Sequence, residues 1–145
     1  MEKIYLDVCC LCRQFDDQTN VRIALESYAI TQILRTIDIL KNELIISEAI
    51  YWEINKIPDI FKKNQIIDTI KQIVPIQLIN ESVIKRAKQF ENFGFKGFDA
   101  IHIALAEFAK ADYFLTTDDK LQKIYNSNKN KINIKILNPI DYLRR

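Results

Sequence analysis

The stretch Ile4-Tyr5-Leu6-Asp7-Val8 places a carboxylate at the end of an apolar, β-branched segment near the N-terminus. This pattern predicts a buried β-strand over residues 3–8. An aspartate in such a strand is costly to bury unless it is hydrogen-bonded or paired with a positive charge. Asp7 therefore marks a candidate functional site at the end of the strand.

Further acids lie at comparable positions. Asp99 opens the helical segment Phe98-Asp99-Ala100-Ile101-His102-Ile103-Ala104, and Asp118 and Asp119 close the apolar segment Tyr113-Phe114-Leu115-Thr116-Thr117. Ligands of a parallel α/β sheet bind outside the carboxyl ends of its strands, so these acids are expected to converge there. Clustered carboxylates repel one another, and a hard cation such as Mg²⁺ or Mn²⁺ relieves the repulsion. The pattern predicts metal-assisted phosphodiester chemistry.

Strands and helices alternate along the rest of the chain. Further strands are predicted at residues 44–46, 75–79, 112–116 and 132–137. Helices are predicted at residues 20–41, 48–55, 58–73, 81–90 and 99–110, then after Asp118 and from Pro139, with loops at 13–19 and 126–131. This alternation favours right-handed βαβ crossovers and an α/β fold with a mostly parallel sheet of about five strands.

Composition limits the classes of protein that fit. A length of 145 residues with 48% hydrophobic residues fits one domain over residues 1–145. The net charge of +2 is too small to indicate nucleic-acid binding by itself. No apolar run is long enough to span a membrane, and the first residues do not resemble a signal peptide, so we expect a cytoplasmic protein without membrane contact.

All three cysteines lie in one segment, at positions 9, 10 and 12. An odd, clustered set is not a disulfide framework. Cys9 and Cys12 have the spacing of a metal-binding pair, but His102 is the only histidine and no second pair exists. We expect reduced thiols.

Four motifs, in this order, resemble the PIN-domain family of nucleases. They are Tyr5-Leu6-Asp7, the pair Ser47 and Glu53, Phe98-Asp99-Ala100-Ile101-His102, and Ala111-Asp112-Tyr113-Phe114-Leu115-Thr116-Thr117-Asp118. The resemblance covers essentially the whole chain. It implies a three-layer α/β/α PIN-like fold with an acidic pocket at the strand ends, and Mg²⁺- or Mn²⁺-dependent ribonuclease activity.

Carried over by position, Asp7, Glu53, Asp99 and Asp118 match the four acids of the family, with the three aspartates as metal ligands. Many small bacterial members are toxins of the VapC type, so the resemblance also implies an RNA substrate, an antitoxin partner and a homodimer. The residues after Asp7 depart from the family pattern, because relatives often place Ser or Thr where Val8 lies. The departure affects neighbouring contacts and leaves the acids in place.

Two of the acids have rivals. Glu48 and Glu53 are five residues apart, so they point roughly 140° apart on a helix and only one of them is expected to face the pocket. Glu48 is explained by the helix dipole, and Glu53 fits the family spacing. Asp119 competes with Asp118, since either can follow the strand as a ligand or as a helix cap.

Other polar residues are secondary candidates. Thr116 and Thr117 are placed to hydrogen-bond a ligand water or a phosphate, although strand ends are commonly polar. Arg13 lies close enough in sequence to the site to contact substrate phosphates. His102, one helical turn after Asp99, is interpreted as a hydrogen-bonded packing residue.

Other functions remain as alternatives. A PIN-like domain without productive metal geometry would be a catalytically silent protein- or RNA-binding module. A phosphatase of the haloacid-dehalogenase type needs Asp-x-Asp on the first strand, where this chain has Asp7-Val8-Cys9. A receiver domain needs an aspartate after the third strand, where this chain has Ile79-Asn80. Both phosphotransfer interpretations are therefore weak.

Overall fold

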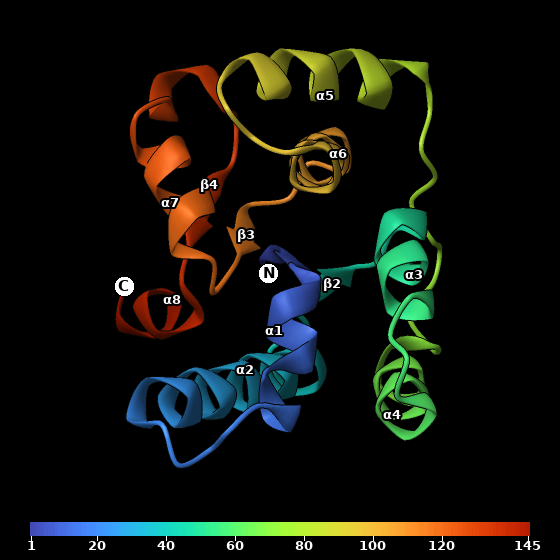
Figure 1. Cartoon of the computed structure of the whole chain (residues 1–145), viewed down its shortest axis with the longest axis vertical. Coiled ribbons are helices and arrows are strands. Elements are labelled where there is room, and N and C mark those ends of the chain that lie inside the picture. Colours follow the sequence, from blue (N-terminus) through green and yellow to red (C-terminus); the bar gives the residue numbers. More distant parts are fainter.

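Four short parallel strands form the central sheet of the computed structural model, which describes residues 1–145 (Figure 1). They are β1 (Lys3–Leu6), β2 (Glu43–Ile45), β3 (Tyr113–Leu115) and β4 (Lys135–Leu137). The order in the sheet is β2-β1-β3-β4, and every neighbouring pair is parallel. Tyr5 in the central strand β1 is opposite Ile45 on one side and Phe114 on the other.

Eight helices surround this sheet. They are α1 (Val8–Cys12), α2 (Val21–Ile39), α3 (Glu48–Asn55), α4 (Ile60–Ile70), α5 (Glu81–Asn92), α6 (Gly97–Phe108), α7 (Asp119–Asn126) and α8 (Pro139–Arg144). Figure 1 shows α5 and α6 on one side of the sheet and α1 and α2 on the other. The predicted three-layer α/β/α arrangement is thus confirmed. None of the helices combines the length and the apolar character that crossing a membrane requires.

Helix starts follow the polar residues that the sequence singles out. The side chains of Ser47, Asn80 and Asp118 accept hydrogen bonds from backbone N–H groups in the first turns of α3, α5 and α7. Such caps satisfy backbone donors that have no partner within the helix. The predicted starts of these three helices are confirmed.

The predicted strand at residues 75–79 does not form, so the sheet has four strands and not about five. A single parallel β-bridge connects this segment to the residues that follow β2, and it pairs Gln77 with Ser47. The Gln77 N–H donates to the Ile46 carbonyl at 2.8 Å, and the Glu48 N–H donates to the Gln77 carbonyl at 3.0 Å. Pro75 has no N–H group with which to extend the ladder.

The first strand is also shorter than predicted. It ends at Leu6, because the Asp7 side chain accepts from the Val8 N–H at 2.9 Å and caps the short helix α1. At the other motif, α6 begins at Gly97, so Asp99 is the third residue of the helix and not its cap. Both aspartates remain at the ends of elements that reach the same edge of the sheet.

One fully buried carboxylate ties the elements of this edge together. Glu26 of α2 accepts from the Arg13 Nη2 at 2.6 Å, the Arg22 Nε at 3.2 Å and the Asn138 Nδ2 at 2.5 Å. Asn138 follows β4 and caps α8. Two arginines and an amide thus compensate the buried charge, and they link α2 to the turn after α1 and to the end of β4.

Removing this carboxylate should destabilise the protein strongly. The Glu26→Ala variant leaves two arginines without their buried partner, so we expect a loss of about 3–5 kcal/mol in the free energy of unfolding. Urea denaturation measures it. As a control, Asp68→Ala breaks an exposed ion pair with Lys71 and should cost less than about 1 kcal/mol. Equal losses in the two variants would show that the Glu26 network does not hold this edge together.

Candidate functional site

Parallel pairing brings four segments to one edge of the sheet. Because all strands run in the same direction, the residues that follow them share the carboxyl edge. The Asp7 N–H donates to the Leu115 carbonyl at 2.9 Å, and the Thr116 N–H donates to the Leu137 carbonyl at 3.0 Å. These bonds continue the ladder beyond the strands and fix Asp7 beside Thr116.

Asp7 is buried and is held by neutral donors only. One carboxylate oxygen accepts from the Val8 N–H at 2.9 Å and the other accepts from the Thr116 hydroxyl at 2.9 Å. The Cys9 Sγ lies 3.5 Å from the second oxygen. Burial raises the pKa of Asp7 well above its ordinary value, and the neighbouring Cys9 raises this pKa further. No lysine or arginine pairs with this carboxylate.

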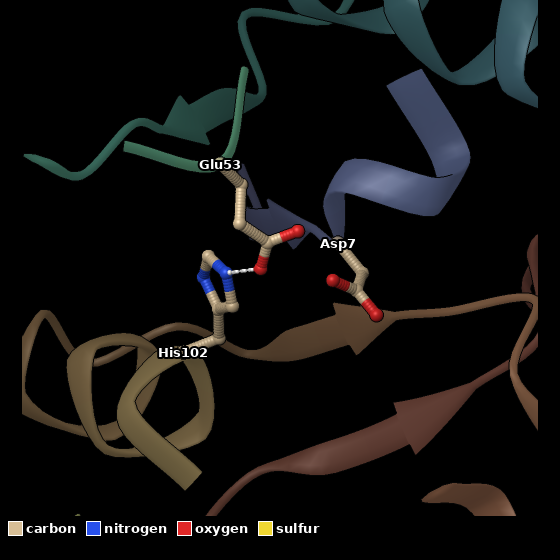
Figure 2. A group of neighbouring side chains, drawn as sticks. All are labelled: Asp7, Glu53 and His102. Carbon is tan, nitrogen blue, oxygen red and sulfur yellow. Dashed lines mark hydrogen bonds and ion pairs between the residues drawn. The ribbon is translucent and has the colours of Figure 1, made fainter. Parts of the chain in front are cut away.

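Glu53 of α3 and His102 of α6 lie beside Asp7 (Figure 2). Candidate ligand atoms of these three residues all lie within 4.8 Å of one another. The His102 Nε2 is 2.6 Å from one Glu53 oxygen. Figure 2 shows the other Glu53 oxygen on the side of Asp7. A pair of carboxylates thus faces a common space at the edge of the sheet.

Asp99 and Asp118 lie outside the group whose ligand atoms are within 4.8 Å of one another, but the charge of Asp99 acts on Asp7 and the charge of Asp118 acts on Asp99. Asp99 is half-buried in the first turn of α6, and its pKa is raised by burial first and then by the charge of Asp118. Asp118 is exposed and caps α7 through one oxygen, which accepts from the Lys120 and Leu121 N–H groups. Its other oxygen accepts no hydrogen bond from the protein, so it is free to bind a ligand.

A comparison with models of known protein families identifies the family of this chain. The family model described as "PIN domain" matches residues 4–127. The chain belongs to the PIN-domain family. The segments that carry the acids, from β1 to the start of α7, lie within the matched residues.

Solved structures share the fold of this PIN domain. FitAcB from Neisseria gonorrhoeae superposes with a TM-score of 0.60 at 16% identity, covering 94% of this chain and 97% of that chain. VapBC2 from Rickettsia felis, bound to a DNA fragment from the VapBC2 promoter, superposes with a TM-score of 0.61 at 13% identity, covering 94% and 98%. Identities this low show the fold alone. No curated protein sequence matches the chain significantly.

The two rival acids, Glu48 and Asp119, are hydrogen-bonded to other groups of this PIN domain. The Glu48 carboxylate accepts from the Ile79 N–H at 2.7 Å, so it fastens the segment that runs beside β2. Both oxygens of Asp119 accept from the Arg22 guanidinium at 2.7 Å, and this pairing lowers the pKa of Asp119. The Glu48 and Asp119 carboxylates are thus engaged in other contacts, and Asp119 lines one cavity together with Asp118.

The remaining candidates from the sequence are Thr116, Thr117 and Arg13, and only Thr116 contacts two of the acids. Thr116 is buried, and its oxygen also accepts from the Asp118 N–H at 3.1 Å, so it connects two of the acids. The Thr117 N–H donates to the Cys9 Sγ at 3.5 Å. Arg13 is engaged by Glu26 and is turned away from the cluster.

The cysteines are free thiols, as predicted. Hydrogen bonds from Cys10, Thr117 and Thr116 lower the pKa of Cys9 to about 6 despite its burial. Burial raises the pKa of Cys10 well above its ordinary value. None of the three is paired in a disulfide, so no covalent link constrains the segment that carries Asp7.

Sequence reasoning assigned His102 to packing and missed its contact with an acid of the cluster. Its position three residues after Asp99 was the available signal, because such residues share a helix face. Two lysines were also missed. Lys56 and Lys96 line an open cavity of about 640 Å³ together with Glu53 and Asp99, and they place positive charge beside the acids.

Replacing Asp7 with Asn should stabilise the metal-free protein at neutral pH. The folded-state pKa of Asp7 is raised, so its stabilising contribution is present below its unfolded pKa of about 4 and is lost as pH rises through the folded-state value. Asn cannot ionise and avoids this loss. We expect Asp7→Asn to gain about 1–2 kcal/mol at pH 7 in EDTA.

Urea denaturation at pH 4 and pH 7 measures the gain, which should shrink at the lower pH. The exposed Asp68→Asn variant is the control and should change little at either pH. A metal-free Asp7→Asn protein less stable than the wild type at pH 7 would contradict the proposed cost of the buried charge.

Proposed function

We propose that this PIN domain is a divalent-metal-dependent ribonuclease that hydrolyses RNA phosphodiester bonds. The observation that carries the proposal is the pair of carboxylates, Asp7 and Glu53, whose ligand atoms lie within 4.8 Å at the carboxyl edge of the sheet. Asp99 and Asp118 lie near enough to influence one another's charge. No lysine or arginine forms an ion pair with any of these four acids, so together they form a site for a cation.

The residues present fit Mg²⁺ or Mn²⁺. Carboxylate oxygens are the ligands that these hard cations prefer. The Asp7 carboxylate is buried among neutral donors, and burial raises its pKa, so a bound cation would compensate its charge. In this proposal Asp7, Asp99 and Asp118 bind the metal, and Glu53 is the fourth catalytic acid.

When bound, the cation would supply an activated water near neutral pH and would stabilise charge on the phosphate. The chain's own residues orient the ligands and bind the substrate. Thr116 holds Asp7 and the backbone of Asp118 in one arrangement. Lys56 and Lys96, beside the acids, are placed to contact the phosphates of the substrate.

Single-stranded RNA is the proposed substrate form. Phe98 lines the same open cavity as the two lysines, with the Lys56 Nζ 4.6 Å from the centre of its ring. Aromatic rings beside basic groups bind unpaired bases by stacking, whereas paired bases are inaccessible. This combination favours unpaired over double-stranded substrates.

The proposal extends to a role as the toxin of a toxin–antitoxin pair. The sequence resembles small bacterial toxins of the VapC type, and the fold is that of FitAcB and VapBC2. A cavity of about 330 Å³ between α1, α2 and α4 offers an apolar surface for an antitoxin, including Leu11, Ile30, Leu34 and Ile66. A homodimer is part of the same proposal.

Cleavage of a pool of single-stranded and structured RNAs, with Mg²⁺, with Mn²⁺ and with EDTA, tests the activity. We expect metal-dependent cleavage of single strands that falls at least about 100-fold in Asp99→Asn, because a ligand is lost. Asp68→Asn is the control and should cleave like the wild type. Comparing Asp118→Asn with Asp119→Asn identifies which of these two aspartates is the metal ligand, and only Asp118→Asn should lose activity.

Wild-type cleavage that survives in EDTA, or in Asp99→Asn, would contradict the proposed site. Absence of cleavage under every condition, together with absence of Mn²⁺ binding by calorimetry, would favour a catalytically silent protein- or RNA-binding module.

A further inference from the structure

We propose that His102 is a positioning residue that sets the orientation of the Glu53 carboxylate. It does so as part of a hydrogen-bonded circuit of four side chains, whose two ends, Ser47 and Glu53, are connected through the backbone of α3. The circuit runs from Ser47 through Tyr5 and His102 to Glu53. This inference rests on the proposed function, because it concerns how one of the four acids is held. It adds a role that neither the motif nor the acid cluster assigns to His102.

The circuit is short and buried. The Tyr5 hydroxyl lies 2.7 Å from the Ser47 Oγ and 2.5 Å from the His102 Nδ1. The His102 Nε2 lies 2.6 Å from Glu53. Tyr5, Ser47 and His102 are each 0% exposed. Water therefore cannot replace the two Tyr5 contacts without a rearrangement of the core, whereas the Glu53 carboxylate is partly exposed.

The circuit joins both ends of one helix to the central strand. Ser47 caps the start of α3 and Glu53 lies two turns further along the same helix. Tyr5 comes from β1 and His102 from α6. Contacts with β1 thus fix both the position of the Glu53 backbone and the orientation of its carboxylate. Asp7 directly follows the same strand.

As part of this proposal, we assign the direction of each bond from the partners of each group. The Ser47 oxygen accepts from the Ile50 N–H at 3.2 Å, so its own proton is available to Tyr5. Tyr5 then donates to the His102 Nδ1, which leaves the ring proton on Nε2. That proton is donated to Glu53, since a carboxylate only accepts. No buried side-chain polar atom is left without a partner.

This arrangement leaves the Nε2 lone pair unavailable, so His102 is not itself a metal ligand. The ring is also fixed by packing, with Tyr5 at 5.6 Å in an edge arrangement and Phe98 stacked at 6.2 Å between ring centres. The fixed ring of His102 in turn fixes the orientation of the Glu53 carboxylate. One oxygen is held by His102, and the other is presented toward Asp7 (Figure 2). In this inference Glu53 also contacts the metal, through the oxygen that faces Asp7, and hydrogen-bond partners such as His102 tune the affinity of metal-binding carboxylates.

The tautomer of His102 gives a readout that does not depend on activity. His102 is the only histidine in the chain, so its ring gives one unambiguous set of signals in a long-range proton–nitrogen NMR spectrum. We expect an Nε2-protonated ring in the metal-free protein that keeps this proton when Mg²⁺ is added. A ring protonated only on Nδ1, or loss of the Nε2 proton on adding Mg²⁺, would overturn the proposal.

Variants test the positioning itself. We expect His102→Leu to weaken Mg²⁺ binding about 10–100-fold by calorimetry. His102→Gln should recover part of that affinity, because its amide can donate to Glu53. Adding His102→Leu to Glu53→Gln should cause little further loss, since the two residues act as one unit. The control is Tyr142→Phe, which removes a buried hydroxyl whose partner is Glu2, and it should bind Mg²⁺ like the wild type.

Folded His102→Leu and His102→Gln proteins with equal losses, or losses that add fully to that of Glu53→Gln, would overturn the positioning role. Tyr5→Phe leaves packing in place and provides a second variant if His102→Leu does not fold. It should release the tautomer preference and weaken Mg²⁺ binding. A wild-type protein that binds no Mg²⁺ would contradict the proposed function, whereas additive losses in an active enzyme would contradict this inference alone.

Discussion

The parallel pairing of β1 with β2 and β3 is the constraint on which the rest of the structure depends. It sends the carboxyl ends of three chain segments to one edge, so that residues far apart in sequence meet there. Asp7 lies beside Thr116 because the ladder continues past Leu6, and Ser47 lies near Tyr5 for the same reason. The acidic cluster follows directly from strand direction, and the helices α3 and α6 then add Glu53, His102 and Asp99.

The two buried carboxylates of this molecule, Glu26 and Asp7, differ in how their negative charge is compensated. Glu26 is surrounded by Arg13, Arg22 and Asn138, so the chain itself compensates its charge. Asp7 accepts hydrogen bonds from neutral donors only; besides burial, Cys9 and Asp99 raise its pKa, and His102 lowers it. Because an uncompensated buried charge is costly, the contrast indicates that compensation at Asp7 comes from outside the chain. This contrast is the physical basis of the metal-site proposal.

Sequence reasoning anticipated the features that depend on local chemistry. The alternation of strands and helices, and the caps at Ser47, Asn80 and Asp118, follow from short-range patterns, and the structure has them. The strand expected at residues 75–79 is reduced to a single bridge between Ser47 and Gln77, because Pro75 has no N–H group for a longer ladder. The spacing from Asp99 indicated which helix face His102 lies on, but not its contact with Glu53, which requires the packing of α6 against α3 and a tyrosine from β1. The roles of the four acids remain predictions.

The most direct test of the central claim is the anomalous scattering of Mn²⁺ in crystals of the wild-type protein. The account predicts a peak between the carboxylates of Asp7 and Glu53, on the side of Asp99 and Asp118, that disappears in Asp7→Asn crystals treated identically. Saturating Mn²⁺ with no peak at this edge of the sheet, or a peak that persists in Asp7→Asn, would contradict it.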